Sequence, residues 1–259
     1  MQVGQGATPL TGPLPAHYLG ASPTPSPSIS YEFLVWAPVL LFSIVAHEYA
    51  HAEAAYRQGD DTAYMLGRLT LNPLKHIDPF MTVLFPVILW FASGGRFTFG
   101  AAKPVPVTPR KYRNFRKGDI IVSLAGIATN LGLFVLAAVL FAVVGFLGDA
   151  LPGLTGTWEI VQRMLVYGML MNVWLAIFNL LPIPPLDGSH VFKYILPPEA
   201  GLKYRQLYAM GYLPILAFLL FVKLVPAAQA VYLWPAHELM HGALSVVGRF
   251  GVSDGAFPQ

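Results

Sequence analysis

The chain carries an HExxH pattern, His47–His51, inside a segment apolar enough to span a membrane. From Phe33 to Ala46 no residue is charged. Two histidines four residues apart lie on one face of a helix and can hold one metal ion. The glutamate between them, Glu48, is then placed to act as general base for a water molecule at the metal. Because ionisable groups at membrane depth are costly, we expect this cluster to be a functional site.

Composition also indicates an all-α polytopic membrane protein. Of the 259 residues, 55% are hydrophobic and 11% are charged, and the mean hydropathy is +0.56, whereas a soluble domain is about 25% charged. The net charge of +3 is too small to indicate a nucleic-acid partner. The absence of cysteine excludes disulfides and thiolate metal ligands.

The apolar segments predict about five to six transmembrane helices. Residues 1–30, which are uncharged and rich in Pro, Ser and Gly, are expected to form a disordered tail. Residues 31–259 are expected to form one intramembrane domain. The candidate spans are 31–57, 120–147, 160–181, 207–224 and 227–247, the last being less apolar because it carries His237, Glu238 and His241.

Between the first two full spans, residues 79–91 are apolar but short. About 20 residues are needed to cross a bilayer, and Gly94-Gly95 follows almost at once. We therefore expect 79–91 to re-enter the membrane without crossing it. The next residues, Arg96–Phe99, alternate like a short β-strand.

The distribution of basic residues tests this topology. If 79–91 does not cross, every lysine and arginine except Arg163 and Lys223 falls on one side of the membrane. If it crosses, the bias is weaker, and basic loops normally face the cytoplasm. We therefore expect an integral protein, in the cell membrane, with its N-terminus outside and with its basic loops and C-terminus in the cytoplasm. The strongly basic loop 110–117 is then expected to be a topology signal that contacts lipid head groups.

A catalytic zinc site needs a third protein ligand, and Asp187 is the best candidate. It follows Pro182, Pro184 and Pro185, which cannot continue a regular helix. Gly188 beside it permits a tight turn or a close approach of the backbone. If both motifs hold one metal, the spans that carry them must run parallel. Gly126 and Gly132 would allow close helix packing in the span between them.

Together, His47–His51 and the stretch Asn179-Leu-Leu-Pro-Ile-Pro-Pro-Leu-Asp187-Gly188 resemble the site-2 protease family of intramembrane zinc metalloproteases. The resemblance covers roughly residues 33–192, including 67–79 and 102–106. A family landmark, Ala-Gly-Pro followed by Asn, is similar to 125–130 here, with Ile127 in place of the proline. We find no room for PDZ or CBS modules, so the chain looks like a minimal member. The resemblance implies these roles: one zinc ion per chain bound by His47, His51 and Asp187, Glu48 as catalytic base, and Asn179 as a group that stabilises the oxyanion.

Three polar features allow two interpretations each. A second HExxH at His237–His241 is either a polar helix face, or a secondary metal site or active-site cover. His76 either lies near the metal site or makes local hydrogen bonds in its loop. Asn130 is either an interhelical hydrogen-bonding group or a catalytic one.

The predicted function is hydrolysis of peptide bonds in transmembrane helices of membrane-protein substrates within the lipid bilayer. Nothing in the sequence indicates an oligomeric state. One alternative is a catalytically silent membrane binding protein with a structural zinc site. Another is a metal or proton transporter, which would need polar groups along its spans, yet 120–147, 160–181 and 207–224 are nearly devoid of them.

Overall fold

The computed structural model describes residues 31–84, 87–88, 91, 103–253 and 256–257, and these form helices and connecting turns without a strand. The α-helices are α1 (Tyr31–Arg57), α2 (Thr62–Met65), α4 (Phe115–Ala150), α5 (Thr155–Leu180), α6 (Asp187–Phe192), α7 (Pro198–Gln206), α8 (Leu213–Leu224) and α9 (Pro226–Val247). The short helical turns are η2 (Pro73–Lys75), η3 (Pro79–Leu84), η4 (Pro109–Lys111), η5 (Pro152–Leu154), η6 (Leu207–Met210) and η7 (Gly248–Phe250).

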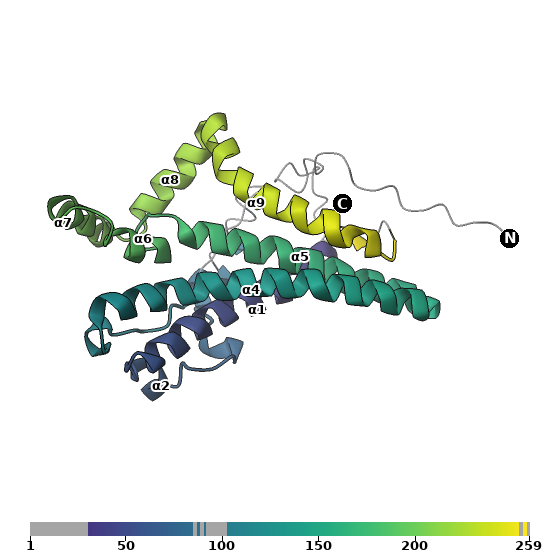
Figure 1. Cartoon of the computed structure of the whole chain (residues 1–259), viewed down its shortest axis with the longest axis horizontal. Coiled ribbons are helices and arrows are strands. Elements are labelled where there is room, and N and C mark those ends of the chain that lie inside the picture. The colour runs from purple at the N-terminus through teal and green to yellow at the C-terminus, as the bar shows by residue number, and fades with distance from the viewer. Residues whose placement is uncertain (1–30, 85–86, 89–90, 92–102, 254–255, 258–259) are drawn as a thin grey trace.

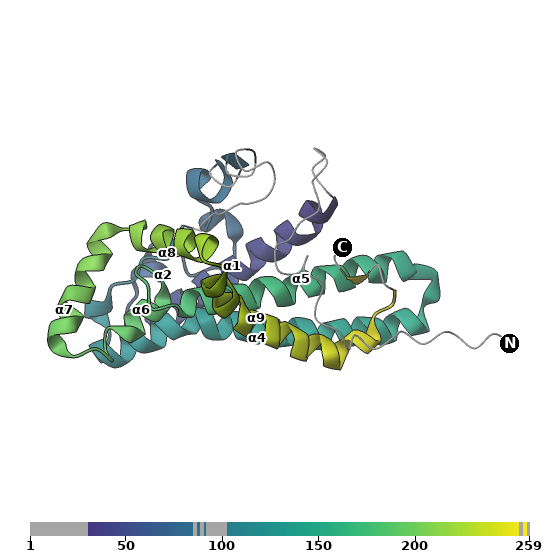
Figure 2. The ribbon, with the colours of Figure 1, turned by 90° about the horizontal axis from the view of Figure 1, so that it is seen from above.

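Helix α4, the longest, and helix α5 pack side by side as a hairpin that sets the long axis of the molecule (Figure 1). Helix α1 crosses this hairpin obliquely and packs on both of its helices (Figures 1 and 2). Helix α9 lies along α5 and α4, and α8 joins it at a sharp corner. The three central helices therefore meet around one interior, in which polar side chains can be shielded from lipid.

Helices α1 and α5 run in the same direction, as the shared-metal argument predicts. Ser43 lies beside Asn172, with 2.9 Å between the serine Oγ and the amide nitrogen. Further along both chains, His51 lies beside Asp187. Helix α4 packs on both and runs the opposite way, because His47 contacts Asn130 whereas His51 contacts Val122. The C-terminal ends of α1 and α5 consequently reach the same level.

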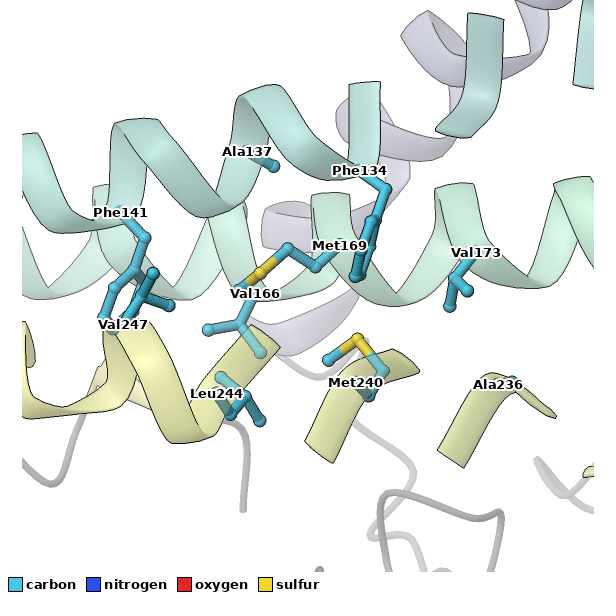
Figure 3. Packing of buried hydrophobic residues seen from close by; sticks show 10 residues of the cluster. All are labelled: Phe134, Ala137, Phe141, Val166, Met169, Val173, Ala236, Met240, Leu244 and Val247. Atoms are coloured by element: carbon cyan, nitrogen blue, oxygen red, sulfur yellow. The ribbon is translucent and has the colours of Figure 1, made fainter. Parts of the chain in front are cut away.

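The main apolar core lies between α4, α5 and α9 (Figure 3). Its fully buried side chains include Phe141 from α4 and Met169 from α5, against which Met240 of α9 packs. This packing fixes α9 on the α4–α5 hairpin at the end distant from the HExxH of α1. The ten buried residues of the core are Phe134, Ala137, Phe141, Val166, Met169, Val173, Ala236, Met240, Leu244 and Val247.

The predicted number of five to six spans is too high. Three helices in the described part of the chain are long and apolar enough to cross a membrane: Phe33–Arg57, Phe115–Ala150 and Pro152–Leu180. A fourth arises only if Pro198–Met210 and Leu213–Leu224, bent by 90°, count as one span. Helix α8 alone has 12 residues, too few to cross about 30 Å of hydrocarbon. Helix α9 has 22 residues but is made less apolar by its polar side chains.

Three further predictions concern residues that the structure describes in part or not at all. Of 79–91, the first six residues form η3, and the segment is not among the candidate spans. The strand-like Arg96–Phe99 and the tail 1–30 lie outside the described residues.

Helix α4 continues unbroken past Ile127, the position at which the landmark of the family that the sequence resembles has proline. Its two glycines differ in environment. A Cβ atom at Gly126 would collide with both histidines of α1, whereas one at Gly132 would meet nothing within 4 Å. The expectation of close packing is therefore confirmed at Gly126 and wrong at Gly132.

Candidate metal centre

The side chains of His47, His51 and Asp187 converge on one point. The Nε2 atoms of the histidines lie 3.1 and 3.2 Å from Oδ2 of Asp187 and 3.0 Å from each other. This is the one group of three such residues in the described part of the chain whose ligand atoms could hold a metal ion. The structure thus brings together the three predicted ligands.

The two histidines come from one face of α1, and Asp187 arrives by a sharp turn. The chain leaves α5 at Leu180 and re-enters a helix at Asp187. A Cβ atom at Gly188 would lie 2.1 Å from the carbonyl oxygen of Leu180. The predicted close backbone approach at Gly188 is therefore present, and it folds α6 back against the end of α5.

The outer nitrogen of each histidine faces a hydrogen-bond acceptor. Nδ1 of His51 lies 2.7 Å from the carbonyl oxygen of Val122, and Nδ1 of His47 lies 2.5 Å from Oδ1 of Asn130. The Asn130 amide is oriented by its own donation to Oδ1 of Asn172, at 2.7 Å. Each Nδ1 must therefore carry the proton, which leaves both Nε2 atoms with free lone pairs.

These atoms fit a zinc ion. Two nitrogen lone pairs and a carboxylate oxygen point at one another, and Oδ2 of Asp187 is buried without a hydrogen-bond donor among the described residues. Such a grouping is repulsive unless a cation lies between the atoms. Ligands placed about 2.0 Å from a tetrahedral zinc are about 3.3 Å apart, close to the observed separations. Two histidines and one carboxylate form a three-ligand set that leaves a fourth position open.

A network of buried polar side chains extends from Asn130, the partner of His47, into the interior between α1, α4 and α5. Asn172 donates from Nδ2 to Oγ of Ser43 at 2.9 Å and to the carbonyl of Gly168 at 2.8 Å. The Ser43 hydroxyl donates in turn to the carbonyl of Val39. Ser43, Asn130 and Asn172 are almost completely buried. The network has every donor and acceptor satisfied, so it can hold His47 in one orientation.

Sequence reasoning missed the roles of Ser43 and Asn172, and the expectation that 120–147 and 160–181 are nearly free of polar groups is wrong. Asn130, Gln162 and Asn172 are buried inside them. The signal was present, since an uncharged polar residue within an apolar span usually faces the helix bundle. For Asn130, the structure favours the interhelical hydrogen bond over a catalytic role.

Helix α6 is anchored to the first turns of α4 through Asp119, which is 3% exposed. Its carboxylate lies 2.6 Å from Nζ of Lys193 and 3.4 Å from Nδ1 of His190, and it accepts a 2.9 Å hydrogen bond from Tyr194. Burial and the bond to Asp119 raise the pKa of Tyr194, so its hydroxyl stays a donor. Helix α4 therefore positions both halves of the site, the histidines through Gly126 and Asp187 through α6.

The remaining candidate residues are not part of the ligand group. Glu48 points toward the segment before α4 and accepts a 2.7 Å hydrogen bond from the backbone nitrogen of Val105. Asn179 donates from its side chain to the carbonyl of Leu175, in its own helix, at 3.0 Å. His76 is buried and bonds through Nε2 to the carbonyl of Thr70, so the local interpretation holds for it.

The second HExxH, on α9, has no third ligand among the residues that the structure describes. The rings of His237 and His241 stack with 6.2 Å between centroids, and Glu238 lies against His237 and is exposed. Within the described residues no further ligand joins them. The structure thus favours the polar-face interpretation.

Comparison with known proteins agrees with this geometry. Residues 35–222 match the model of "Peptidase family M50". The chain is 37% identical over 196 residues to "Putative zinc metalloprotease YwhC" of Bacillus subtilis, covering 76% of this chain and 82% of that protein. It is 32% identical over 185 residues to "Putative zinc metalloprotease Rip2" of Mycolicibacterium smegmatis, covering 70% of this chain and 64% of the relative. No solved structure gives a significant match.

Proposed function

This chain is a zinc metalloprotease of peptidase family M50, the site-2 protease family, and we propose that it cleaves peptide bonds in transmembrane segments of other membrane proteins. The observation that carries the proposal is the position of the ligand group. His47 and His51 lie within a helix that is long and apolar enough to span the membrane. A substrate must therefore reach them from within the bilayer or from its edge.

We assign the metal to His47, His51 and Asp187, with one zinc ion per chain. Bound zinc would supply Lewis acidity, which polarises the scissile carbonyl and makes water a nucleophile at neutral pH. Glu48 follows His47 directly on α1, where its carboxylate is placed to take the proton of the attacking water. The same carboxylate then delivers this proton to the leaving amine.

Asn179 is the proposed donor to the developing oxyanion, a contribution worth about 2.7–4 kcal/mol for one side chain in other proteases. For this role its amide must turn from the carbonyl of Leu175 toward the substrate. A helical substrate must also unwind locally, because its carbonyl groups are otherwise hydrogen-bonded within the helix.

The experiment compares membranes of cells that express the wild type or the Glu48→Gln variant by N-terminal proteomics. The glutamine is isosteric and leaves the three proposed ligands intact. We expect new N-termini inside apolar segments with the wild type alone, and equal zinc content in both purified proteins. Normal cleavage by the variant would remove Glu48 from the mechanism. New N-termini only in soluble loops would contradict intramembrane cleavage.

We further propose that the protein lies in the cell membrane with its N-terminus outside and with the basic loop 110–117 in the cytoplasm. The bias of basic residues supports this orientation. Because the chain has no cysteine, single cysteines can be introduced at Lys111 and at Gly153, in the turn between α4 and α5. A thiol reagent that cannot cross membranes should label the second position in intact cells and the first only after lysis.

A further inference from the structure

An extended segment, residues 103–107, lies against α1 beside the metal centre, and we call it the strap. Its sequence is Lys-Pro-Val-Pro-Val, so prolines flank Val105 on both sides. Val105 is 8% exposed and packs with Ala52 and Ala63, with Leu69 at the edge of this cluster. The strap is therefore held on α1 by its one buried side chain.

The backbone N–H groups of the strap are few, because proline has none. Lys103 donates to the carbonyl of His76 at 2.9 Å. Val105 donates to Oε2 of Glu48 at 2.7 Å. Val107 makes no hydrogen bond through its nitrogen among the described residues. The central N–H group of the strap, that of Val105, thus donates to the proposed catalytic base, Glu48.

Arg68 holds the strap from its other side. The Arg68 side chain is buried, and Nη2 donates to the carbonyl of Lys103 at 2.8 Å and contacts the carbonyl of Pro104 at 3.4 Å. The Pro104 carbonyl and the Val105 N–H belong to one planar peptide unit. The 3.4 Å contact with this oxygen is weak, so the main effect of Arg68 is to hold the strap through the 2.8 Å bond to the carbonyl of Lys103.

We propose that Arg68 and the backbone of Val105 position Glu48 for proton transfer. The inference rests on the proposed role of Glu48. Arg68 holds the strap through the carbonyl of Lys103, and the Val105 N–H of the strap holds Oε2 of Glu48. The second oxygen, Oε1, is then left to exchange the proton with the attacking water and the leaving amine. Arg68 and Val105 touch neither substrate nor metal in this scheme, so they are positioning residues.

The test removes the N–H group of Val105. The Val105→Pro variant loses this donor and also replaces the buried valine side chain, so Val105→Ala, which keeps the N–H and loses side-chain contacts, is measured beside it. The control for loss of an N–H is Val107→Pro, the same exchange two residues further on, at an exposed residue whose N–H makes no hydrogen bond within the described part of the chain. The substrate is a single-span reporter that carries the most abundant cleaved segment from the proteomic comparison.

We expect kcat of Val105→Pro to fall about 10- to 100-fold, since misplacing a catalytic group by about 1 Å has an effect of this size. KM and zinc content should stay at wild-type values, and the melting temperature should fall no further than in Val105→Ala, which should keep kcat near the wild-type value. The Val107→Pro control should match the wild type in kcat, KM, zinc content and melting temperature. Arg68→Met should lower kcat in the same way, and Arg68→Lys, which keeps a cationic donor, should recover part of the loss.

Several results would overturn the inference. Wild-type kcat in Val105→Pro would show that the contact does not matter, and a higher kcat would show that it inhibits. A loss of zinc or of melting temperature in step with the rate, in both the Val105 and Arg68 variants, would mean that the strap only stabilises the fold. Glu48→Gln is measured in parallel: if that variant cleaves normally, the proposed function itself fails, whereas an inactive Glu48→Gln with a normal Val105→Pro refutes the positioning role alone.

Discussion

Gly126 of α4 lies against His51 of α1 with no room for a side chain between them. A Cβ atom at position 126 would lie 2.5 Å from Nε2 of His51 and 2.5 Å from Cε1 of His47. The glycine therefore closes the metal centre on the side of α4. It also makes α4 the surface against which both imidazole rings rest.

The first prediction follows from this contact. Gly126→Ala should lower zinc affinity at least tenfold, because the new methyl group would displace the rings from their ligand positions. Helix propensity works in the opposite direction, since alanine is favoured over glycine by about 1 kcal/mol within a helix. Because overpacking a buried contact costs about 1–3 kcal/mol, we expect a folded variant with an unchanged or lower melting temperature that loses zinc in a chelator competition.

Gly132→Ala is the matched control, because a Cβ atom there meets nothing within 4 Å. It should retain zinc and gain slightly in stability. Equal zinc affinity for the alanine variants at 126 and 132 would contradict the arrangement of α1 and α4 described above.

The second prediction concerns Asn130, whose Oδ1 accepts from His47. Partners of this kind fix the tautomer of the ligand, and their removal commonly lowers metal affinity about 10- to 100-fold. We expect this loss for Asn130→Ala in chelator competition. Thr129→Ala, at the preceding position of α4, should keep the zinc affinity of the wild type. An unchanged affinity in Asn130→Ala would mean that Asn172 and Ser43 do not act on the metal through Asn130.

The ligand set was predictable because its signals are local. His47 and His51 are spaced for one helix face, and Asp187 is marked by the prolines before it and by Gly188. The parallel course of α1 and α5 followed from requiring one shared metal. These inferences depend on covalent geometry and chemistry, which a sequence shows directly.

The number of spans was less predictable, because hydropathy alone does not tell where a helix bends. The 90° bend before α8 interrupts the apolar stretch 207–224, which hydropathy alone predicts to be one membrane span. The network from His47 through Asn130 to Asn172 was also hidden, since its members are 42 or more residues apart in the sequence. Only the packing of α1, α4 and α5 brings them together.

The third prediction addresses the anchor of α6. Asp119→Ala leaves Lys193 without its carboxylate in a site where both side chains are largely buried. Breaking a buried pair by removing one partner costs about 3–5 kcal/mol. We expect a lower melting temperature and weaker zinc binding, because α6 carries Asp187 at its first position. Asp149→Ala, at the exposed far end of the same helix, should change neither. Wild-type zinc affinity in Asp119→Ala would show that Asp187 is held by the turn after α5 alone.

The fourth prediction is that zinc binding does not depend on the contacts at the opposite end of the helix bundle. Gln162 of α5 is fully buried and links three backbone groups. Its amide nitrogen donates to the carbonyls of Phe141 and Phe250, at 3.0 and 2.8 Å, and its oxygen accepts from the nitrogen of Val252 at 2.8 Å. Close packing supports these bonds, since a Cβ atom at Gly145 would lie 2.1 Å from the carbonyl oxygen of Phe250. Gln162 thus fastens the residues after α9 to the α4–α5 hairpin.

Gln162→Ala leaves buried backbone groups without partners, at about 1–3 kcal/mol for each. We expect faster proteolysis after Val247 and a lower melting temperature, with zinc affinity unchanged because the ligands lie at the other end of α4 and α5. Gln229→Ala, at an exposed position of α9, serves as the control and should resist proteolysis as the wild type does. If zinc affinity fell together with protection of the C-terminal residues, the two ends of the hairpin would be coupled, and the metal centre would depend on the α9 packing as well as on α1, α4 and α6.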